Sequence, residues 1–583
     1  MGSGTVTDIV DVLREVKLLD EAGKLSRSIR IKFYRNYTVE FIEPFLKYYF
    51  GQLGIRCEIS FGGYDTVHQD VLGGEDLASY DLVVLSLTHQ DLSADWDSPA
   101  VSAGELVERV TGMADLILGR TKAPLILNGF IRPLLDEGGA ANTLRDASPS
   151  RRVAELNDGL RRYAAGKAPR CQLIDWERIV MLVGYEEAFD RRMGYMAAAP
   201  FRSAFMRGYA HEIFRIGRAL KGNAKKCLIL DCDNTLWGGI VGEAGLDGIE
   251  LDRHTYPGKV FFDFQKAIVR LAGEGVMVAL CSKNNLDDVM AVLDRHPDCV
   301  LKRDHLVGYR VNWEPKEANI KELVEDLNIG MDAVVFVDDS AIECSRVQAF
   351  LPDITVLQVP KRLTDLPLLI GREGYFDKLV VTAEDLTRTN MYREESRRRE
   401  SVAAFADVEE FLAALDLKAV IKRPEQGQVS RVSQLTQKTN QFNLTTRRYS
   451  EGEILGMLGD EDWGVFALSA ADRFGDLGLV GVLIAHRIGD EAIVDTLLMS
   501  CRALGRRLEA EFVATCVEQL QAKWRARTWA AEYVKTAKNG QVAEFWPAFG
   551  FAESERQDAT VRYRAAPGEL KLDHTPYIQV RGA

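Results

Sequence analysis

Two carboxylates and a thiol stand in a row at Asp231, Cys232 and Asp233, directly after the apolar run 227–230. Such a run is typical of a buried parallel strand, and reactive groups in parallel sheets lie at the carboxyl ends of the strands. Alternation along the strand points Asp231 and Asp233 to the same side, where two negative charges are unfavourable unless a cation shares the space. We therefore predict a site for a hard divalent cation such as Mg2+.

Further polar groups of the same kind follow downstream. In chain order they are Ser282 and Asn284 after the apolar run 276–280, Lys316 behind Pro315, and Asp338 with Asp339 after the apolar run 333–337. The hydroxyl and the amide are able to hold phosphate oxygens. An isolated pair of aspartates is usually a surface or turn feature, so it is this ordered set that indicates phosphoryl transfer.

The order and spacing of these motifs resemble the haloacid dehalogenase (HAD) superfamily. The resemblance implies that Asp231 is the nucleophile that becomes a phospho-aspartate, and that Asp233 protonates the leaving oxygen and then activates water. The other implied roles are Mg2+ binding by Asp231, the backbone carbonyl of Asp233 and Asp338, phosphoryl binding by Ser282 and Lys316, and substrate contacts from Thr235, Asn284 and Asp339.

The composition indicates an enzyme of several domains. The 583 residues carry a formal net charge of −13, which argues against a dominant nucleic-acid role. The chain shows neither an apolar stretch long enough for a membrane helix nor a signal-peptide pattern at its start. Nine cysteines without a CxxC pair favour a reducing compartment, and eight scattered histidines show no zinc cluster. We expect about three or four domains in a cytoplasmic protein that binds neither nucleic acid nor membrane.

Residues 1–222 alternate short apolar runs with amphipathic stretches, which is typical of a doubly wound α/β fold. The expected elements are strands at 29–34, 57–61, 80–87, 123–128 and 171–174, and a crossover helix at 38–53. The layout resembles an SGNH-hydrolase or flavodoxin-like domain. Arg35 and Asn36 stand where such an esterase carries its serine nucleophile, so we expect a scaffolding or docking domain.

Three regions follow the first domain: a HAD-like domain at 223–378, a charged helical connector at 379–418, and a third α/β domain at 419–583. In the last region strand-like runs cover 465–469, 479–486 and 492–499, and a helical pattern covers 508–520.

A basic corner at residues 501–507 joins the last of these strands to the helix. A strand, a glycine-containing basic loop and a helix N-terminus can bind an anion, and with residues 545–551 the corner resembles the acyl-CoA and pantetheine-binding half of the GNAT fold. Arg507 stands where GNAT proteins usually have a small residue, which leaves docking of a protein-bound phosphopantetheine arm as the alternative to CoA binding. The residues assigned to the carrier and its arm are Arg431, Lys438, Asn440, Arg447, Arg448, Cys501, Arg502, Gly505 and Arg506.

Segments 231–243, 312–316 and 438–447 together resemble the FkbH-like family of HAD proteins. Members take a glyceryl unit from D-1,3-bisphosphoglycerate, remove phosphate, and load the acyl group onto the phosphopantetheine thiol of an acyl carrier protein for methoxymalonyl-type or tetronate-like polyketide synthesis. The resemblance implies that Cys232 holds the acyl group, with Cys501 as the rival thiol. Two alternatives stay open: a plain Mg2+-dependent phosphatase of a small phosphorylated acid, and a non-catalytic docking scaffold.

Overall fold

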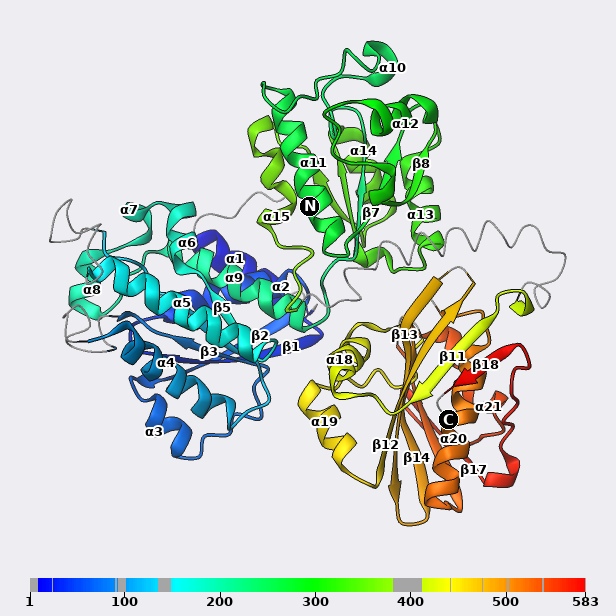
Figure 1. Cartoon of the computed structure of the whole chain (residues 1–583). Helices are drawn as coiled ribbons and strands as arrows, with labels where there is room; N and C mark the ends of the chain where they lie inside the picture. The colour runs from blue at the N-terminus through cyan, green and yellow to red at the C-terminus, as the bar shows by residue number, and fades with distance from the viewer. Residues whose placement is uncertain are drawn as a thin grey trace. The chain divides into compact units, whose positions relative to one another are not determined.

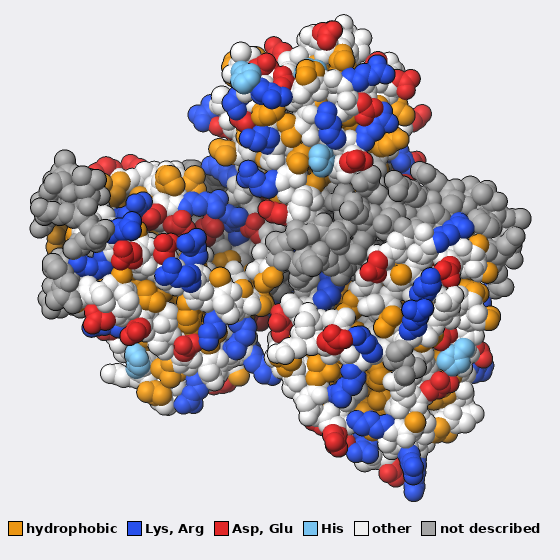
Figure 2. Space-filling view, in the orientation of Figure 1, with side chains coloured by type: hydrophobic (Ala, Val, Ile, Leu, Met, Phe, Trp, Pro, Cys, Tyr) orange, Lys and Arg blue, Asp and Glu red, His pale blue; other side chains and the backbone are white. Residues whose placement is uncertain are grey.

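The computed structural model describes residues 9–21, 23, 25–89, 92, 101–134, 148–380, 412–440, 442–473, 475–500, 503–536 and 539–581. These residues form three β-sheets, each with its own hydrophobic clusters (Figure 1). The chain divides into two compact units, of which the first holds the residues up to Asn223 together with Asp377–Val380. None of the described helices combines the length and the apolarity that a membrane crossing requires. On the face shown in Figure 2, positive and negative side chains are interspersed.

The first sheet has five parallel strands in the order β2-β1-β3-β4-β5. The elements of this region are α1 (Ile9–Glu21), β1 (Arg27–Arg35), η1 (Glu40–Ile42), α2 (Glu43–Gly51), β2 (Ile55–Tyr64), α3 (Val67–Leu72), β3 (Leu82–Ser86), α4 (Ala103–Leu118), β4 (Leu125–Asn128), α5 (Pro149–Lys167), β5 (Cys171–Ile174), α6 (Trp176–Val183), α7 (Tyr185–Ala188), α8 (Arg191–Ala197) and α9 (Ser203–Leu220). Alternate residues of β3 join different clusters, because Val84 packs with residues of α2 and α9 whereas Val83 packs with residues of α4 and α5. Helices therefore cover both faces, and the predicted doubly wound pattern is confirmed.

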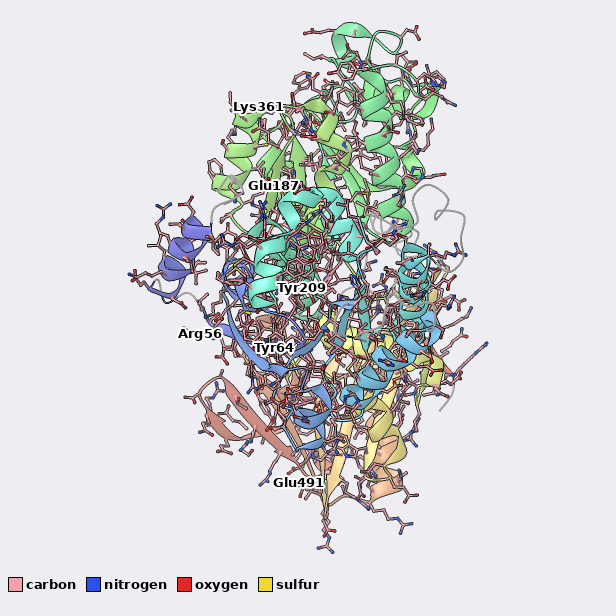
Figure 3. All side chains as sticks on the ribbon, turned by 90° about the vertical axis from the view of Figure 1, so that its left-hand side faces the viewer. Arg56, Tyr64, Glu187, Tyr209, Lys361 and Glu491 are labelled. Carbon is pink, nitrogen blue, oxygen red and sulfur yellow. The ribbon has the colours of Figure 1, made fainter. Side chains whose placement is uncertain are left out.

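Polar residues at the carboxyl end of the first sheet are hydrogen-bonded to other residues of the same region. Asn36 is buried and both donates to the Thr88 carbonyl at 3.0 Å and accepts from the Thr88 amide at 2.8 Å. The Tyr209 hydroxyl, labelled in Figure 3, donates to the Ser86 hydroxyl at 3.1 Å. Arg35 forms an ion pair with a glutamate of η1. Asn36 thus links the ends of β1 and β3.

The second sheet is also parallel, in the order β10-β9-β6-β7-β8. Its region contains β6 (Cys227–Leu230), α10 (Val241–Ala244), α11 (Gly258–Gly273), β7 (Met277–Ser282), α12 (Leu286–Arg295), η4 (Arg303–His305), β8 (Leu306–Val311), α13 (Lys316–Asp326), η5 (Met331–Ala333), β9 (Val334–Asp338), α14 (Ala341–Phe350), β10 (Thr355–Gln358), η6 (Leu363–Leu368) and α15 (Leu369–Arg372). On β6, Leu228 packs with residues of α11 and α12, while Ile229 packs with residues of α13. Burial on both faces explains why the strands of this sheet are continuous apolar runs.

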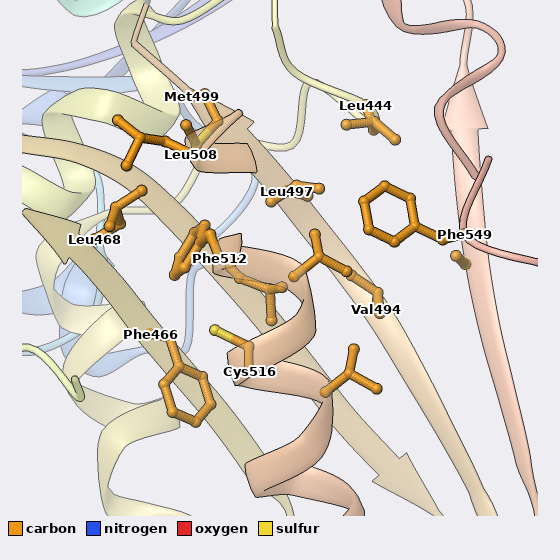
Figure 4. Packing of buried hydrophobic residues seen from close by; sticks show 14 of the residues in the cluster. Leu444, Phe466, Leu468, Val494, Leu497, Met499, Leu508, Phe512, Cys516 and Phe549 are labelled. Carbon is orange, nitrogen blue, oxygen red and sulfur yellow. The ribbon is translucent and has the colours of Figure 1, made fainter. Parts of the chain in front are cut away.

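The third sheet has eight strands in the order β16-β17-β15-β14-β13-β12-β11-β18. Its region contains β11 (Leu417–Lys422), η7 (Gln426–Gln428), α18 (Val429–Lys438), α19 (Glu451–Gly459), β12 (Trp463–Asp472), β13 (Gly475–Ile488), β14 (Glu491–Met499), α20 (Leu508–Trp524), β15 (Thr528–Val534), η9 (Gly540–Val542), α21 (Phe545–Ala548), β16 (Ala552–Gln557), β17 (Thr560–Ala565), η10 (Pro567–Glu569) and β18 (Ile578–Arg581). Phe512 and Cys516 of α20 lie in the core beside Phe466 and Leu468 of β12 (Figure 4). Most neighbouring strands are antiparallel, with β14/β15 and β11/β18 as parallel pairs. Of the predicted connector, residues 381–411 lie outside the described part of the chain.

Candidate active site

Three carboxylates meet where β6 and β9 end in the second sheet. Leu230 of β6 pairs with Val337 of β9, and the Asp231 amide donates to the Val337 carbonyl at 2.9 Å. Asp231 therefore lies beside Asp338, and the oxygen atoms of Asp231, Asp338 and Asp339 lie within 4.8 Å of one another. The convergence follows from the parallel pairing, because neighbouring strands present their carboxyl ends at one edge.

A single buried cation lies among these carboxylates. The Lys316 Nζ atom is 2.7 Å from Asp231 Oδ1 and 2.6 Å from Asp338 Oδ2. Lys316 and Asp231 are each 4% exposed and Asp338 is fully buried. Burial raises the pKa of Asp231, which Lys316 opposes, and burial also raises the pKa of Asp339. Burial lowers the Lys316 pKa, but attraction to Asp231 and Asp338 outweighs this and raises it above the ordinary value.

The donor set fits a hard divalent cation. Three carboxylates face one ammonium group, so negative charge exceeds positive charge in a buried space, and all the available ligand atoms are oxygens. The expected metal residues were Asp231, the Asp233 carbonyl and Asp338. The structure adds Asp339, which was assigned to substrate, to this cluster and leaves the Asp233 carboxylate outside it.

The Asp233 carboxylate is held by donors from its own segment after β6 and by one donor from the segment after β7. It accepts hydrogen bonds from Trp237 Nε1 at 2.8 Å, the Val241 amide at 3.1 Å and Asn284 Nδ2 at 2.9 Å. Asn284 also donates to the Ser282 hydroxyl at 3.4 Å. Because each of its oxygens accepts from a neutral donor, the carboxylate is held in one orientation.

Ser282 connects the strand end of β7 to the residues after β6. Its side chain hydrogen-bonds to Asp231 and to the Cys232 thiol. Thr235 is fully buried, and its hydroxyl has no hydrogen-bond partner among the described residues. Ser282, Asn284 and Lys316 thus come together with the aspartates in one site, although three strands and a helix carry them.

The Cys232 side chain lies in the core, where Ser282 hydrogen-bonds to its thiol. Its side chain is fully buried in an apolar cluster that includes Leu236 and Trp237. Burial, reinforced by Asp231, raises the pKa of the Cys232 thiol well above its ordinary value. A protonated, enclosed thiol is a poor nucleophile. The acyl-carrying role of Cys232 stays a prediction that this geometry does not favour.

Sequence reasoning missed Asn234 and Trp237. Asn234 has a φ of 54°, its Oδ1 accepts from the Gly239 amide at 2.9 Å, and its side chain hydrogen-bonds to Asp339. It therefore turns the chain after Asp233 and positions a carboxylate of the metal cluster. An asparagine between a strand and a Gly-Gly pair is the available signal, because asparagine tolerates left-handed backbone and favours turns.

The basic residues assigned to a carrier protein differ in environment. Arg447 is neutralised by ion pairs with Asp495 and with Glu532, the latter at 2.6 Å. Arg506 is buried at 6% exposure. Carrier docking by Arg447 and Arg506 stays a prediction, although ion pairing of Arg447 and burial of Arg506 reduce the charge that these side chains present to solvent.

The other residues assigned to the carrier either contact residues near them in the chain or lie outside the described residues. Arg431 donates to the Gln434 side chain, Arg448 donates to the Gln437 carbonyl and to Asn440 Oδ1, and Gly505 has a φ of 76°. The positions outside the described residues are Cys501, Arg502 and the side chain of Lys438.

The chain itself occupies the space where β14 and β15 separate. These strands pair in parallel only from Glu491 to Val494 of β14. Beyond that point the Leu444 amide donates to the Leu497 carbonyl at 3.1 Å, and the Val534 amide donates to the Leu444 carbonyl at 2.7 Å. The segment 442–444 therefore bridges the two strands. Backbone of the same molecule thus fills this space, and the pantetheine site expected at residues 501–507 stays a prediction.

Comparisons with known proteins agree with the geometry of the second sheet. Residues 226–354 match the family model described as NLI interacting factor-like phosphatase. The crystal structure of the N-terminal part of protein BF1531 from Bacteroides fragilis, containing a phosphatase domain complexed with Mg, is similar with a TM-score of 0.57 and 23% identity, covering 63% of this chain and 99% of that chain. The ribosomal-protein-S18-alanine N-acetyltransferase from Escherichia coli matches with a TM-score of 0.21 and 14% identity over 25% of this chain and 93% of its own.

A search of curated proteins found no match. The matched family model covers the strands and loops that carry the carboxylate site. Residues 226–354 accordingly contain a phosphatase domain of the HAD type, which makes the protein an enzyme.

Proposed function

We propose that this protein transfers a D-glyceryl unit from 1,3-bisphosphoglycerate to the phosphopantetheine thiol of an acyl carrier protein, removes phosphate, and so supplies polyketide-type biosynthesis. The observation that carries the phosphoryl chemistry is the buried cluster of Asp231, Asp338 and Asp339 around Lys316. The identity of the acyl donor and of the carrier is supported by the FkbH-like motifs in the sequence.

Asp231, Asp338, Asp339 and the backbone carbonyl of Asp233 would hold Mg2+, which the structurally similar phosphatase domain from Bacteroides fragilis also binds. The bound ion would screen the charge of the phosphoryl group. The Lys316 ammonium supplies a further positive charge beside Asp231, where it can donate hydrogen bonds to phosphoryl oxygens.

The aspartates carry out phosphate removal in two steps. An Asp231 oxygen attacks phosphorus, the bond from phosphorus to the ester oxygen breaks, and that oxygen takes the proton held by Asp233. Asp233 then removes a proton from water, whose oxygen attacks the phosphorus of the aspartyl phosphate. The bond from phosphorus to the Asp231 oxygen breaks, which releases inorganic phosphate and restores the Asp231 carboxylate. Trp237 and Asn284 keep the Asp233 carboxylate in place for both proton transfers.

Acyl transfer requires a thiolate at the activated carboxyl group. The sulfur attacks the acyl carbon, the carbon–sulfur bond forms, and the bond from carbon to the phosphate oxygen breaks with phosphate leaving with the electron pair. The thiol proton passes to the departing phosphate. Because the Cys232 thiol is fully buried and its pKa is raised, we propose that the carrier thiol attacks the acyl carbon directly.

Mass spectrometry of the carrier tests the proposal. The full chain is incubated with Mg2+, 1,3-bisphosphoglycerate and holo carrier protein, and a mass gain of one glyceryl unit without phosphate is expected. Carrier lacking the prosthetic arm is the control for the thiol, and Asp231→Asn is the control for dephosphorylation. Phosphate release without any carrier loading would replace the proposal with the plain phosphatase.

A further inference from the structure

Four exposed apolar side chains stand in the segments that carry the phosphatase site. Ile240 is 43% exposed, Leu286 39%, Trp313 69% and Ile342 72%. Ile240 and Trp313 lie in the loops after β6 and β8, whereas Leu286 and Ile342 lie in the first turns of α12 and α14, which follow β7 and β9. Because these four strands are parallel neighbours in one sheet, the segments that follow them lie at the same edge. We call these four side chains the apolar rim.

Each rim residue is within three positions of a residue that binds a site carboxylate. The attachments are the Val241 amide and Asn284 Nδ2 to Asp233, Lys316 Nζ to Asp231 and Asp338, and the Ser340 amide to Asp338. Two contacts also link the loops to one another: Trp313 Nε1 donates to Asn285 Oδ1 at 3.3 Å, and Lys283 pairs with Glu343 at 2.8 Å. The backbone that carries the rim is thus tied to the site carboxylates, and its segments to one another, by hydrogen bonds and an ion pair.

Binding of a small phosphorylated acid does not require the exposed apolar side chains of the rim. Its groups are polar and are met by Asp231, Lys316 and Ser282, which are all buried. Apolar side chains that surround a polar site and stay in water are characteristic of protein interaction surfaces, and tryptophan is the residue most often decisive there. We therefore expect the partner of the rim to carry apolar surface around a slender reactive group.

We propose that the apolar rim is the docking surface for the acyl carrier protein, which places the carrier's thiol-ended arm at the acyl phosphate bound beside Asp231. The inference rests on the proposed function and names the surface that serves it. The arm has to be slender because the carboxylates it approaches are at most 4% exposed at Asp231 and Asp338. The alternative entry, between β14 and β15, is occupied by segment 442–444.

Paired substitutions in the full chain test the rim. Trp313→Ala and Ile342→Ala remove rim side chains, while Phe350→Ala and Leu368→Ala remove side chains of the same region that are 67% and 63% exposed and lie outside the loops and first helical turns that carry the rim. Each protein is assayed with Mg2+ for carrier loading at varied carrier concentration and for hydrolysis of a small phosphate ester.

The rim variants are expected to raise the KM for carrier by about tenfold while small-ester hydrolysis stays within about twofold of wild type. The Phe350 and Leu368 variants are expected to change neither value. Equal KM values for wild type and rim variants would overturn the docking surface while leaving the transferase proposal standing. Failure of the wild type itself to load any carrier, with ester hydrolysis intact, would instead remove the transferase function on which the inference rests.

Discussion

Replacing Lys316 by methionine should destabilise the phosphatase region strongly when no divalent cation is present. At the 2.7 Å separation of Lys316 and Asp231, Coulomb attraction is about 6 kcal/mol for an effective dielectric constant of about 20. Desolvation offsets part of this, and breaking a buried ion pair costs about 3–5 kcal/mol because a charge is left uncompensated. Here the carboxylates of Asp231, Asp338 and Asp339 would lose their cation together.

Hydrogen–deuterium exchange of peptides from β6, β7 and β9 measures this loss locally, which matters because a chain with several cores need not unfold in one transition. With EDTA, Lys316→Met should lower protection in these peptides by about 10²- to 10⁴-fold, which corresponds to the same free-energy range. With Mg2+ the difference should shrink, since the added cation replaces the missing positive charge. Phosphatase activity should stay low in both conditions.

Lys259→Met is the matched control in the same region. Lys259 pairs with Asp263 at 2.7 Å, but their side chains are 45% and 36% exposed, so its loss should cost less than about 1 kcal/mol. Protection of Lys316→Met equal to that of wild type in EDTA would refute the view that Lys316 balances the charge of this site.

Three further outcomes follow from the described contacts. Cys232→Ala should keep phosphate hydrolysis and carrier loading within about threefold of wild type, measured by phosphate release and carrier mass, because the thiol is buried with a raised pKa. Asn539→Ala should lower protection of segment 442–444 in hydrogen exchange by about 1–3 kcal/mol, because buried Asn539 donates to the Asn443 carbonyl at 2.9 Å. His574→Ala should destabilise the third sheet's region by less than about 1 kcal/mol, and by more at acidic than at alkaline pH, read from exchange in α20, because a hydrogen bond to Glu511 raises the His574 pKa.

The sign of the last effect follows from proton linkage. His574 has a higher pKa in the folded chain than in the unfolded chain, so its contribution is full below the unfolded value and disappears as the pH rises through the folded value. An effect confined to high pH would contradict this assignment. Loss of carrier loading or an acyl group trapped on Cys232 would contradict direct attack by the carrier thiol, and unchanged exchange after Asn539→Ala would contradict its clamping role.

Strand positions in the second sheet were predictable because burial on both faces demands continuous apolar runs. The predicted runs 276–280 and 333–337 correspond to β7 at Met277–Ser282 and β9 at Val334–Asp338. The polar residues that follow such runs reach one edge of a parallel sheet, so Ser282 and Asp338 could be grouped with Asp231 from the sequence. Lys316 was grouped with them by the order of the motifs that resemble the HAD superfamily.

Side-chain partners set by turns and by distant elements were not predictable. Asn234 turns the chain sharply after Asp233 and hydrogen-bonds to Asp339, which joins the metal cluster. Arg447 looked like an exposed docking residue because its partners lie far along the chain, at Asp495 and beyond.

The sequence alone determined the phosphatase chemistry, because Asp231, Asp233 and the residues that complete their site are specified by strand ends whose apolar runs can be read directly. Tertiary structure decided which groups are accessible. Cys232 is buried, and segment 442–444 fills the space between β14 and β15. The segments that follow four parallel strands place the apolar rim at one edge of the second sheet. Accessibility depends on contacts between residues far apart in the chain, and no local pattern of residue types encodes such contacts.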